Sequence, residues 1–166
     1  QLTDLDMPPP PAETSFLFAC VNPTREEAYF WHGRRLLAID LERCTLREGY
    51  VAPEGFLTNI LNCTADGRYI CTGLYEDLSG HFCVDLLHGY VGFREYWEAR
   101  PLSRIIRTAT DGSGAEVVFE ERYWIGHVNT SPTQSHLLTF CHEGPWERVD
   151  NRIWGLDRNT GQARTT

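Results

Sequence analysis

Three segments of this 166-residue chain follow one plan, in which short apolar strands alternate with polar turns. The turns carry the glycine and the aspartate or asparagine of hairpins at residues 65–67, 111–112 and 159–161. Strands such as residues 36–39 are apolar on both faces, which favours sheets stacked against one another over one half-exposed sheet. Short sheets that recur every ~40–50 residues are typical of propeller blades. The pattern therefore predicts an all-β fold of β-propeller-type blades.

The repeat divides the chain into about three blades, each expected to be a four-stranded antiparallel sheet: residues 15–55, 56–122 and 123–166. Residues 1–14, which contain four consecutive prolines, are predicted to be a linker or connector. A closed propeller needs about four to eight blades, so three blades make an incomplete propeller or one that assembles from several copies. Because an open arc exposes the apolar faces of its end blades, we expect self-association or contact with the missing remaining blades.

The middle blade carries an insertion at about residues 77–103, between its second and third strands. Its aromatic residues can share one face of a short helix, which Pro101 would end: Tyr90, Phe93, Tyr96 and Trp97. One interpretation is a lid that packs on the blade edge. The other places Arg94 or Arg100 at the mouth of the propeller channel.

The chain is acidic, with a formal net charge of −8, so nucleic acid is not an expected partner. All 15 basic residues are arginines, and arginine pairs bidentately with carboxylates where lysine does not. Any site for an anionic ligand must therefore be locally cationic. No signal peptide or membrane-spanning apolar run is present, so we expect no membrane association. The six cysteines form no CxxC pair, and we expect reduced thiols and a cytoplasmic location.

The stretch 140–154 carries more chemistry than a hairpin connection needs. It places a histidine, two glutamates, an aspartate and two arginines around a Gly-Pro break. Ordinary hairpin turns are short, whereas this connection also contains His142, Trp146 and Arg152. Loops held by a rigid sheet are where binding and catalytic groups tend to lie. The composition of this segment therefore predicts a functional site.

The string CHEGPW at residues 141–146, followed by Val149-Asp150 and Arg152-Ile153-Trp154, resembles the oligogalacturonide lyase family of pectin breakdown. Upstream, residues 124–127 (WIGH) and 131–134 (SPTQ) fit the same family. The resemblance runs from about residue 15 to the end of the chain and is most specific between CHEGPW and RIW. It implies a β-propeller lyase that cleaves oligogalacturonides by β-elimination. It also implies a divalent metal of the manganese type, held by histidines and a glutamine.

The resemblance implies roles for individual residues as well. Arg152 stands where the family's arginine neutralises the carboxylate whose charge grows during elimination, so Arg152 is the expected catalytic residue. His142 and Glu143 match the site-lining residues of CHEGPW, and with Trp146 and His127 they are expected to bind the substrate. The family's catalytic base and metal ligands are implied to lie on later blades. We therefore expect no metal ligands and no independent activity in residues 1–166.

Two other chemistries are disfavoured by the sequence. Cys141 and His142 are adjacent in an expected strand and point to opposite faces, so they cannot form a thiol–imidazole pair. The group of His127, His136, His142 and Glu143 lacks a tight metal-ligand spacing such as HxH or HExxH, which favours ordinary surface histidines. The alternative to an enzyme is a non-enzymatic propeller-like scaffold that binds acidic sugars or a protein partner.

Overall fold

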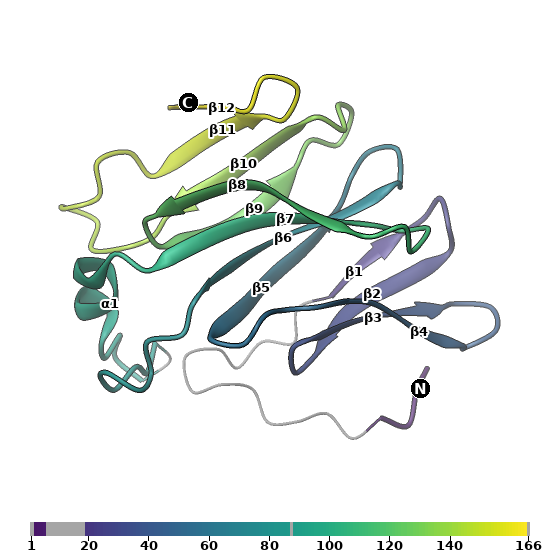
Figure 1. The fold of residues 1–166 in the computed structure, drawn as a ribbon, viewed down its shortest axis with the longest axis horizontal. Coiled ribbons are helices and arrows are strands. Elements are labelled where there is room, and N and C mark those ends of the chain that lie inside the picture. The colour runs from purple at the N-terminus through teal and green to yellow at the C-terminus, as the bar shows by residue number, and fades with distance from the viewer. Residues whose placement is uncertain (1, 6–18, 87, 166) are drawn as a thin grey trace.

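The computed structural model describes residues 2–5, 19–86 and 88–165 and contains three four-stranded antiparallel sheets. Figure 1 shows the sheets side by side in chain order, from the purple first sheet to the yellow-green third. Each sheet is a meander in which consecutive strands pair. The predicted fold class, an all-β chain of propeller-type blades, is confirmed. The predicted linker at 1–14 lies largely outside the described residues.

The strands of the first sheet are β1 (Ala19–Asn22), β2 (Glu27–His32), β3 (Arg35–Asp40) and β4 (Leu46–Val51). Those of the second sheet are β5 (Phe56–Cys63), β6 (Tyr69–Glu76), β7 (Leu102–Ala109) and β8 (Ala115–Arg122). Those of the third sheet are β9 (Ile125–Thr130), β10 (Leu137–His142), β11 (Ile153–Asp157) and β12 (Gln162–Thr165). Each sheet has the four strands that were expected, and the fourth strands, β4, β8 and β12, are rich in polar and exposed residues.

The sheets stack face to face, with β1 against β5 and with β5 and β6 against β9. Neighbouring residues of one strand therefore pack into different hydrophobic cores. Ile106 of β7 belongs to the core between the first and second sheets, which also holds Leu36 and Leu74. Ile105, the residue before it, belongs to the core between the second and third sheets, together with Phe140. Burial on both faces explains why these strands are apolar throughout.

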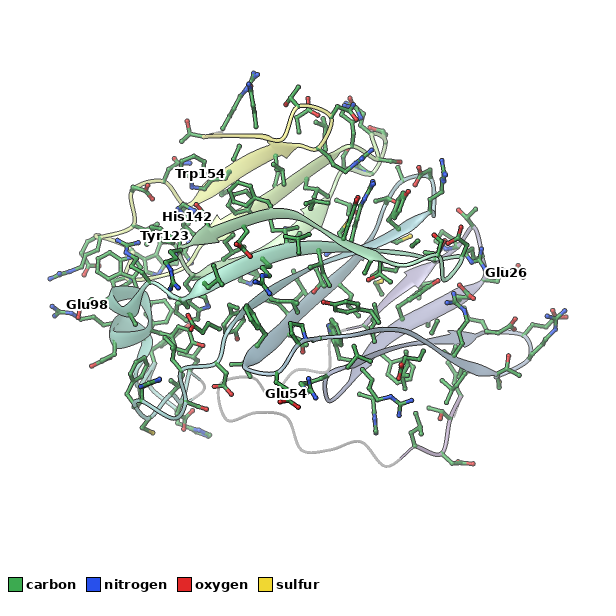
Figure 2. The ribbon with its side chains drawn as sticks, viewed as in Figure 1. Glu26, Glu54, Glu98, Tyr123, His142 and Trp154 are labelled. Atoms are coloured by element: carbon green, nitrogen blue, oxygen red, sulfur yellow. The ribbon has the colours of Figure 1, made fainter. Side chains whose placement is uncertain are left out.

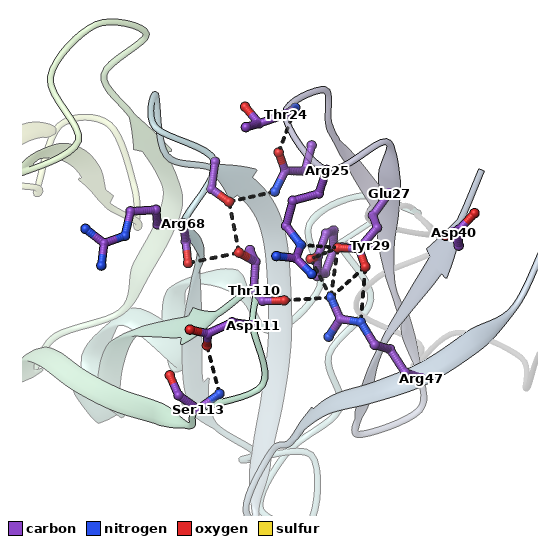
Figure 3. A network of polar contacts seen from close by, with 12 residues as sticks. Thr24, Arg25, Glu27, Tyr29, Asp40, Arg47, Arg68, Thr110, Asp111 and Ser113 are labelled. Carbon is purple, nitrogen blue, oxygen red and sulfur yellow. Dashed lines mark hydrogen bonds and ion pairs between the residues drawn. The ribbon is translucent and has the colours of Figure 1, made fainter. Parts of the chain in front are cut away.

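A buried polar network joins the first sheet to the second (Figure 3). The carboxylate of Glu27 accepts hydrogen bonds from Arg47 at 2.8 Å, from Arg25 at 3.0 Å and from the Tyr29 hydroxyl at 2.5 Å. Arg47 also donates to the backbone oxygen of Thr110, in the β7–β8 turn of the second blade, at 2.8 Å. Burial raises the pKa of Glu27, but the bonds from Tyr29, Arg47 and Arg25 outweigh burial and hold that pKa below its usual value. These ion pairs and hydrogen bonds connect the first blade to the second.

The insertion between β6 and β7 contains the expected short helix, α1 (Phe93–Ala99), which ends at Arg100 just before Pro101. Tyr96 is buried and lies against Tyr75 and Trp124, so α1 packs on the edge of the blade as a lid would. Tyr90 precedes the helix and is exposed. No helix within the described residues is long and apolar enough to cross a membrane.

Candidate functional site

The predicted site lies at one end of the third sheet, where three connections meet. These are the β10–β11 connection, the β8–β9 link and the insertion that carries α1. In Figure 2 the labelled Tyr123, His142 and Trp154 lie together at the end of the molecule that carries the helix. The Arg100 guanidinium lies 4.1 Å from the Tyr123 ring centre, and the Tyr123 ring stacks on His142 at 3.8 Å. The second and third blades therefore both build this region.

Glu143 is the centre of the site. Its carboxylate pairs with the Arg152 guanidinium at 2.8 Å and with His127 Nδ1 at 2.9 Å. The backbone N–H of Glu143 donates a hydrogen bond to the backbone oxygen of Trp124 at 2.8 Å. This bond continues the β9–β10 ladder one residue past the end of β10. Gly126 makes room for the carboxylate, because a β-carbon at that position would lie 2.5 Å from Glu143 Oε1. Glu143 thus links an exposed histidine to an arginine.

A β-bulge in β9 directs His127 into this group. Thr139 pairs with Asn129 and Cys141 with Gly126, so the single residue between them on β10 faces two residues on β9. His127 adopts a left-handed backbone conformation with φ of 47°, which is rare outside glycine. Its side chain is 62% exposed, and the hydrogen bond to Glu143 raises the pKa of His127 above its usual value. Bulges often re-aim a side chain beside a functional site.

Arg152 and Trp146 form a cationic and aromatic surface next to Glu143. The guanidinium of Arg152 lies 4.5 Å from the Trp146 ring centre and donates to the backbone oxygen of Gly144 at 3.3 Å. Trp146 is 80% exposed. An arginine within this distance of an aromatic face is held by cation–π attraction. In a chain of net charge −8, Arg152 and Trp146 form a locally cationic surface beside an exposed aromatic ring.

His142 lies inside the wall of the site, with a side chain that is only 4% exposed. Its Nε2 faces Glu121 at 2.7 Å and its Nδ1 faces Asp150 at 3.2 Å. Both nitrogens can donate only in the imidazolium form. Burial raises the pKa of Asp150, but the Asn151 N–H and His142 outweigh burial and lower that pKa. His142 therefore joins β8 to the β10–β11 connection.

The structure brings together four residues that the sequence singled out: His127, Glu143, Trp146 and Arg152. It places His142 behind them, where the ring does not face open space, so its expected contact with substrate stays a prediction. His136 precedes β10 and lies at the opposite end of that strand from the site. As expected, the side chains of Cys141 and His142 project from different faces of β10: the Cys141 thiol lies near His127 and Glu143, while the His142 ring stacks on Tyr123.

Sequence reasoning assigned no site role to Tyr123 or Cys141 and named Arg100 only as a candidate for the mouth of the propeller channel. Tyr123 lies in the β8–β9 link, directly before the residue whose backbone oxygen accepts from Glu143, and Arg100 reaches its ring from the insertion of the second blade. Cys141 lies close to His127 and Glu143, within 4.8 Å between ligand atoms, and its burial raises the pKa of its thiol. The alternation of Cys141 and Glu143 along one strand was a signal that they share a face.

Stacked four-stranded meanders with a site at one end of a blade define a protein of the β-propeller class. A family model described as oligogalacturonate lyase matches residues 16–166. The chain therefore belongs to the oligogalacturonate lyase family, as the resemblance implied. An oligogalacturonide lyase of Pectobacterium atrosepticum is 34% identical over 72 residues, which are 43% of this chain and 19% of that protein. An oligogalacturonate lyase of Dickeya dadantii is 32% identical over the same length.

Two solved structures show the same fold. An oligogalacturonate lyase in complex with manganese superposes with a TM-score of 0.77 and 22% identity, over 89% of this chain and 39% of the other. An oligogalacturonate lyase from Vibrio parahaemolyticus also gives a TM-score of 0.77, with 20% identity, over 38% of its length. The chain therefore spans about two fifths of the length of these two solved structures.

Proposed function

We propose that the site on the third blade binds an oligogalacturonide and contributes to its cleavage by β-elimination. The observation that carries the proposal is the Arg152 guanidinium, which lies beneath the exposed Trp146 and is oriented by Glu143. Membership in the oligogalacturonate lyase family supports this substrate class. A uronate offers a carboxylate for an arginine and a pyranose ring for an aromatic face.

We assign the catalytic role in this segment to Arg152. During elimination a base removes the proton next to the carboxylate, the bond to the leaving oxygen breaks, and negative charge grows on the carboxylate in between. A cation aimed at that growing charge is usually the largest catalytic contribution. The planar guanidinium can pair with both carboxylate oxygens, and its contact with Glu143 and Gly144 holds it in place.

The other residues supply binding and support. Trp146 would stack on a sugar ring, and His127 and Glu143 would contact hydroxyl groups at the open side of the site. The Glu143 carboxylate would repel an anionic substrate if its charge were not neutralised. Arg152 and His127 both contact the Glu143 carboxylate and can neutralise that charge. His142, with both nitrogens held by carboxylates, would act by fixing the β10–β11 connection.

A solved family member contains manganese, but the residues described here do not fit that ion. Manganese(II) is a hard ion that favours carboxylate, carbonyl and water ligands. The one close group of three potential metal ligands found in the described residues includes the thiol of Cys141. We propose that the complete enzyme uses a divalent metal of the manganese type and that this chain does not supply its ligands.

We also propose two properties of the protein as a whole. A cytoplasmic location agrees with its six free cysteines, which a reducing compartment would preserve. Self-association, or contact with further blades, would cover apolar surface such as Val21, Leu46 and Val51, which are exposed on the first sheet.

Steady-state kinetics with Arg152→Lys test the proposal in an enzyme that carries this segment together with its remaining blades. We expect kcat to fall more than KM rises, because the charge that Arg152 meets grows in the transition state. A loss confined to KM would reduce Arg152 to a substrate-binding residue. Unchanged kcat and KM would refute the assignment of Arg152, whereas an unmodified protein that binds the sugar but forms no product would favour a scaffold that does not cleave it.

A further inference from the structure

His127, Cys141 and Glu143 form a compact group of unlike metal-binding side chains. One ligand atom from each of the three lies within 4.8 Å of those of the other two. The imidazole of His127 is exposed, the thiol of Cys141 is half-buried and the carboxylate of Glu143 is buried. A soft thiol, an imidazole and a carboxylate at this spacing form the kind of donor set that holds a transition metal.

The backbone arrangement explains why these three side chains converge. Cys141 and Glu143 are two residues apart on one continuous strand ladder, so they project from the same face. In a regular strand, His127 would face the opposite side from Gly126, the partner of Cys141. The bulge changes this: Ile125 and Val128, three residues apart, are both in the core, and His127 turns outward to Glu143. The bulge, together with the left-handed φ of His127, therefore places the imidazole beside Cys141 and Glu143.

We propose that His127, Cys141 and Glu143 bind a thiophilic divalent ion, with Zn²⁺ as the ion that fits best. Zinc accepts nitrogen, sulfur and oxygen ligands at about 2.0–2.3 Å. The distances between the three donor atoms must therefore shorten by roughly an ångström when the ion binds. On binding, the Cys141 thiol loses its proton to solvent, and His127 coordinates through a nitrogen of its neutral ring. Three protein ligands leave the fourth tetrahedral position open to solvent.

Arg152 has a defined place in this site. It holds Glu143 Oε2 at 2.8 Å, while Oε1 faces His127. One carboxylate oxygen can therefore bind the ion while the other stays on the guanidinium, which orients the ligand as outer-shell partners commonly do. Manganese is a poor occupant, because it gains little from a thiolate. The zinc site shares His127 and Glu143 with the proposed substrate site, but it does not rest on lyase activity and concerns an ion other than the one in the solved relative.

Spectroscopic titration of the reduced, metal-free 166-residue chain with Co²⁺, a coloured substitute for Zn²⁺, tests this site. We expect one Co²⁺ per chain, a thiolate-to-cobalt charge-transfer band, and complete displacement by Zn²⁺ but not by Mn²⁺. Cys141→Ser should abolish the band and weaken Zn²⁺ binding by more than about tenfold, since even outer-shell changes cost 10–100-fold. Cys44→Ser, at an exposed cysteine, is the matched control and should change neither.

Circular dichroism of both variants verifies that they fold, and His127→Gln provides a second ligand variant, which should weaken Zn²⁺ binding in the same way. A chain that shows no charge-transfer band, or whose band survives in Cys141→Ser, would overturn the proposal. So would Mn²⁺ that displaces Co²⁺ as well as Zn²⁺ does. None of these outcomes bears on whether Arg152 neutralises a uronate, which the kinetic comparison above decides.

Discussion

Replacement of Gly126 by alanine tests whether close packing at β9 organises the site. The new β-carbon would lie 2.5 Å from Glu143 Oε1 and 2.7 Å from its Cγ, whereas ordinary contact begins near 3.4 Å. The carboxylate must therefore move by roughly an ångström. Such a shift is enough to break the 2.9 Å contact with His127 and to misalign the 2.8 Å pair with Arg152.

The magnitude follows from how exposed the partners are. A hydrogen bond to a charged group is worth ~1.5–3 kcal/mol when it is well buried. His127 is 62% exposed, so its contact contributes little, and Arg152 at 29% exposed accounts for most of the loss. Alanine gains ~0.5–1 kcal/mol over glycine in a strand. We therefore expect a net destabilisation of ~1–2 kcal/mol, or a fall in Tm of ~2–8 °C for a chain of this size.

Thermal unfolding followed by circular dichroism measures the effect, with Gly49→Ala as the matched control. Gly49 lies in β4, and its added β-carbon would meet only ordinary contacts at 3.7 and 3.8 Å. The control should be neutral or slightly stabilised, while the His127 ring protons should shift in the NMR spectrum of Gly126→Ala alone. Equal Tm values for the two variants, with an unchanged His127 spectrum, would refute the packing argument.

Four further outcomes are expected. Glu27→Gln should lower the free energy of unfolding by ~1–3 kcal/mol at neutral pH. The fold lowers the pKa of Glu27. The stability that Glu27 contributes is therefore present above its unfolded pKa and is lost as the pH falls through its folded pKa. Urea unfolding from neutral pH to about pH 3 should therefore show a smaller loss of stability in the variant, and parallel curves would contradict this. Gly144→Ala should lower Tm, because a β-carbon there would lie 2.2 Å from Trp97; an unchanged Tm would mean that α1 does not fix the loop. Sedimentation at micromolar concentration should show species above 19.0 kDa, and a single monomer would exclude self-association. With added Mn²⁺, the isolated chain should form no unsaturated product detectable by ultraviolet absorbance, and such a product would show that a base is present after all.

The fold was largely predictable because its main signals are local. Hairpin turns such as 65–67 and 159–161 fall where the sequence placed them, and residues such as Leu36 bury in a core between sheets. Four strands per sheet were expected, but the exact positions of the fourth strands were harder to predict. β8 and β12 satisfy their backbone groups by pairing with a neighbour while their side chains stay largely exposed, so hydrophobic alternation does not reveal them.

The site was predictable in part. The composition of residues 140–154 indicated a functional site with Trp146 and Arg152, the family resemblance added Glu143, and the structure brings the three together. The sequence could not show the bulge that turns His127 outward, because a bulge depends on the register with β10. It also could not show that His142 is buried between Glu121 and Asp150, since Glu121 comes from another blade.

The most direct test of the central claim, that Arg152 recognises a uronate carboxylate, is calorimetric titration of the 166-residue chain with trigalacturonate. We expect binding that the neutral galactose trisaccharide does not reproduce. Arg152→Lys should weaken it by about tenfold or more, because the bidentate pair is lost, while Arg43→Lys, an exposed arginine of the first sheet, should have no effect. Equal affinities for the unmodified chain and Arg152→Lys, or equal binding of the neutral trisaccharide, would contradict the claim.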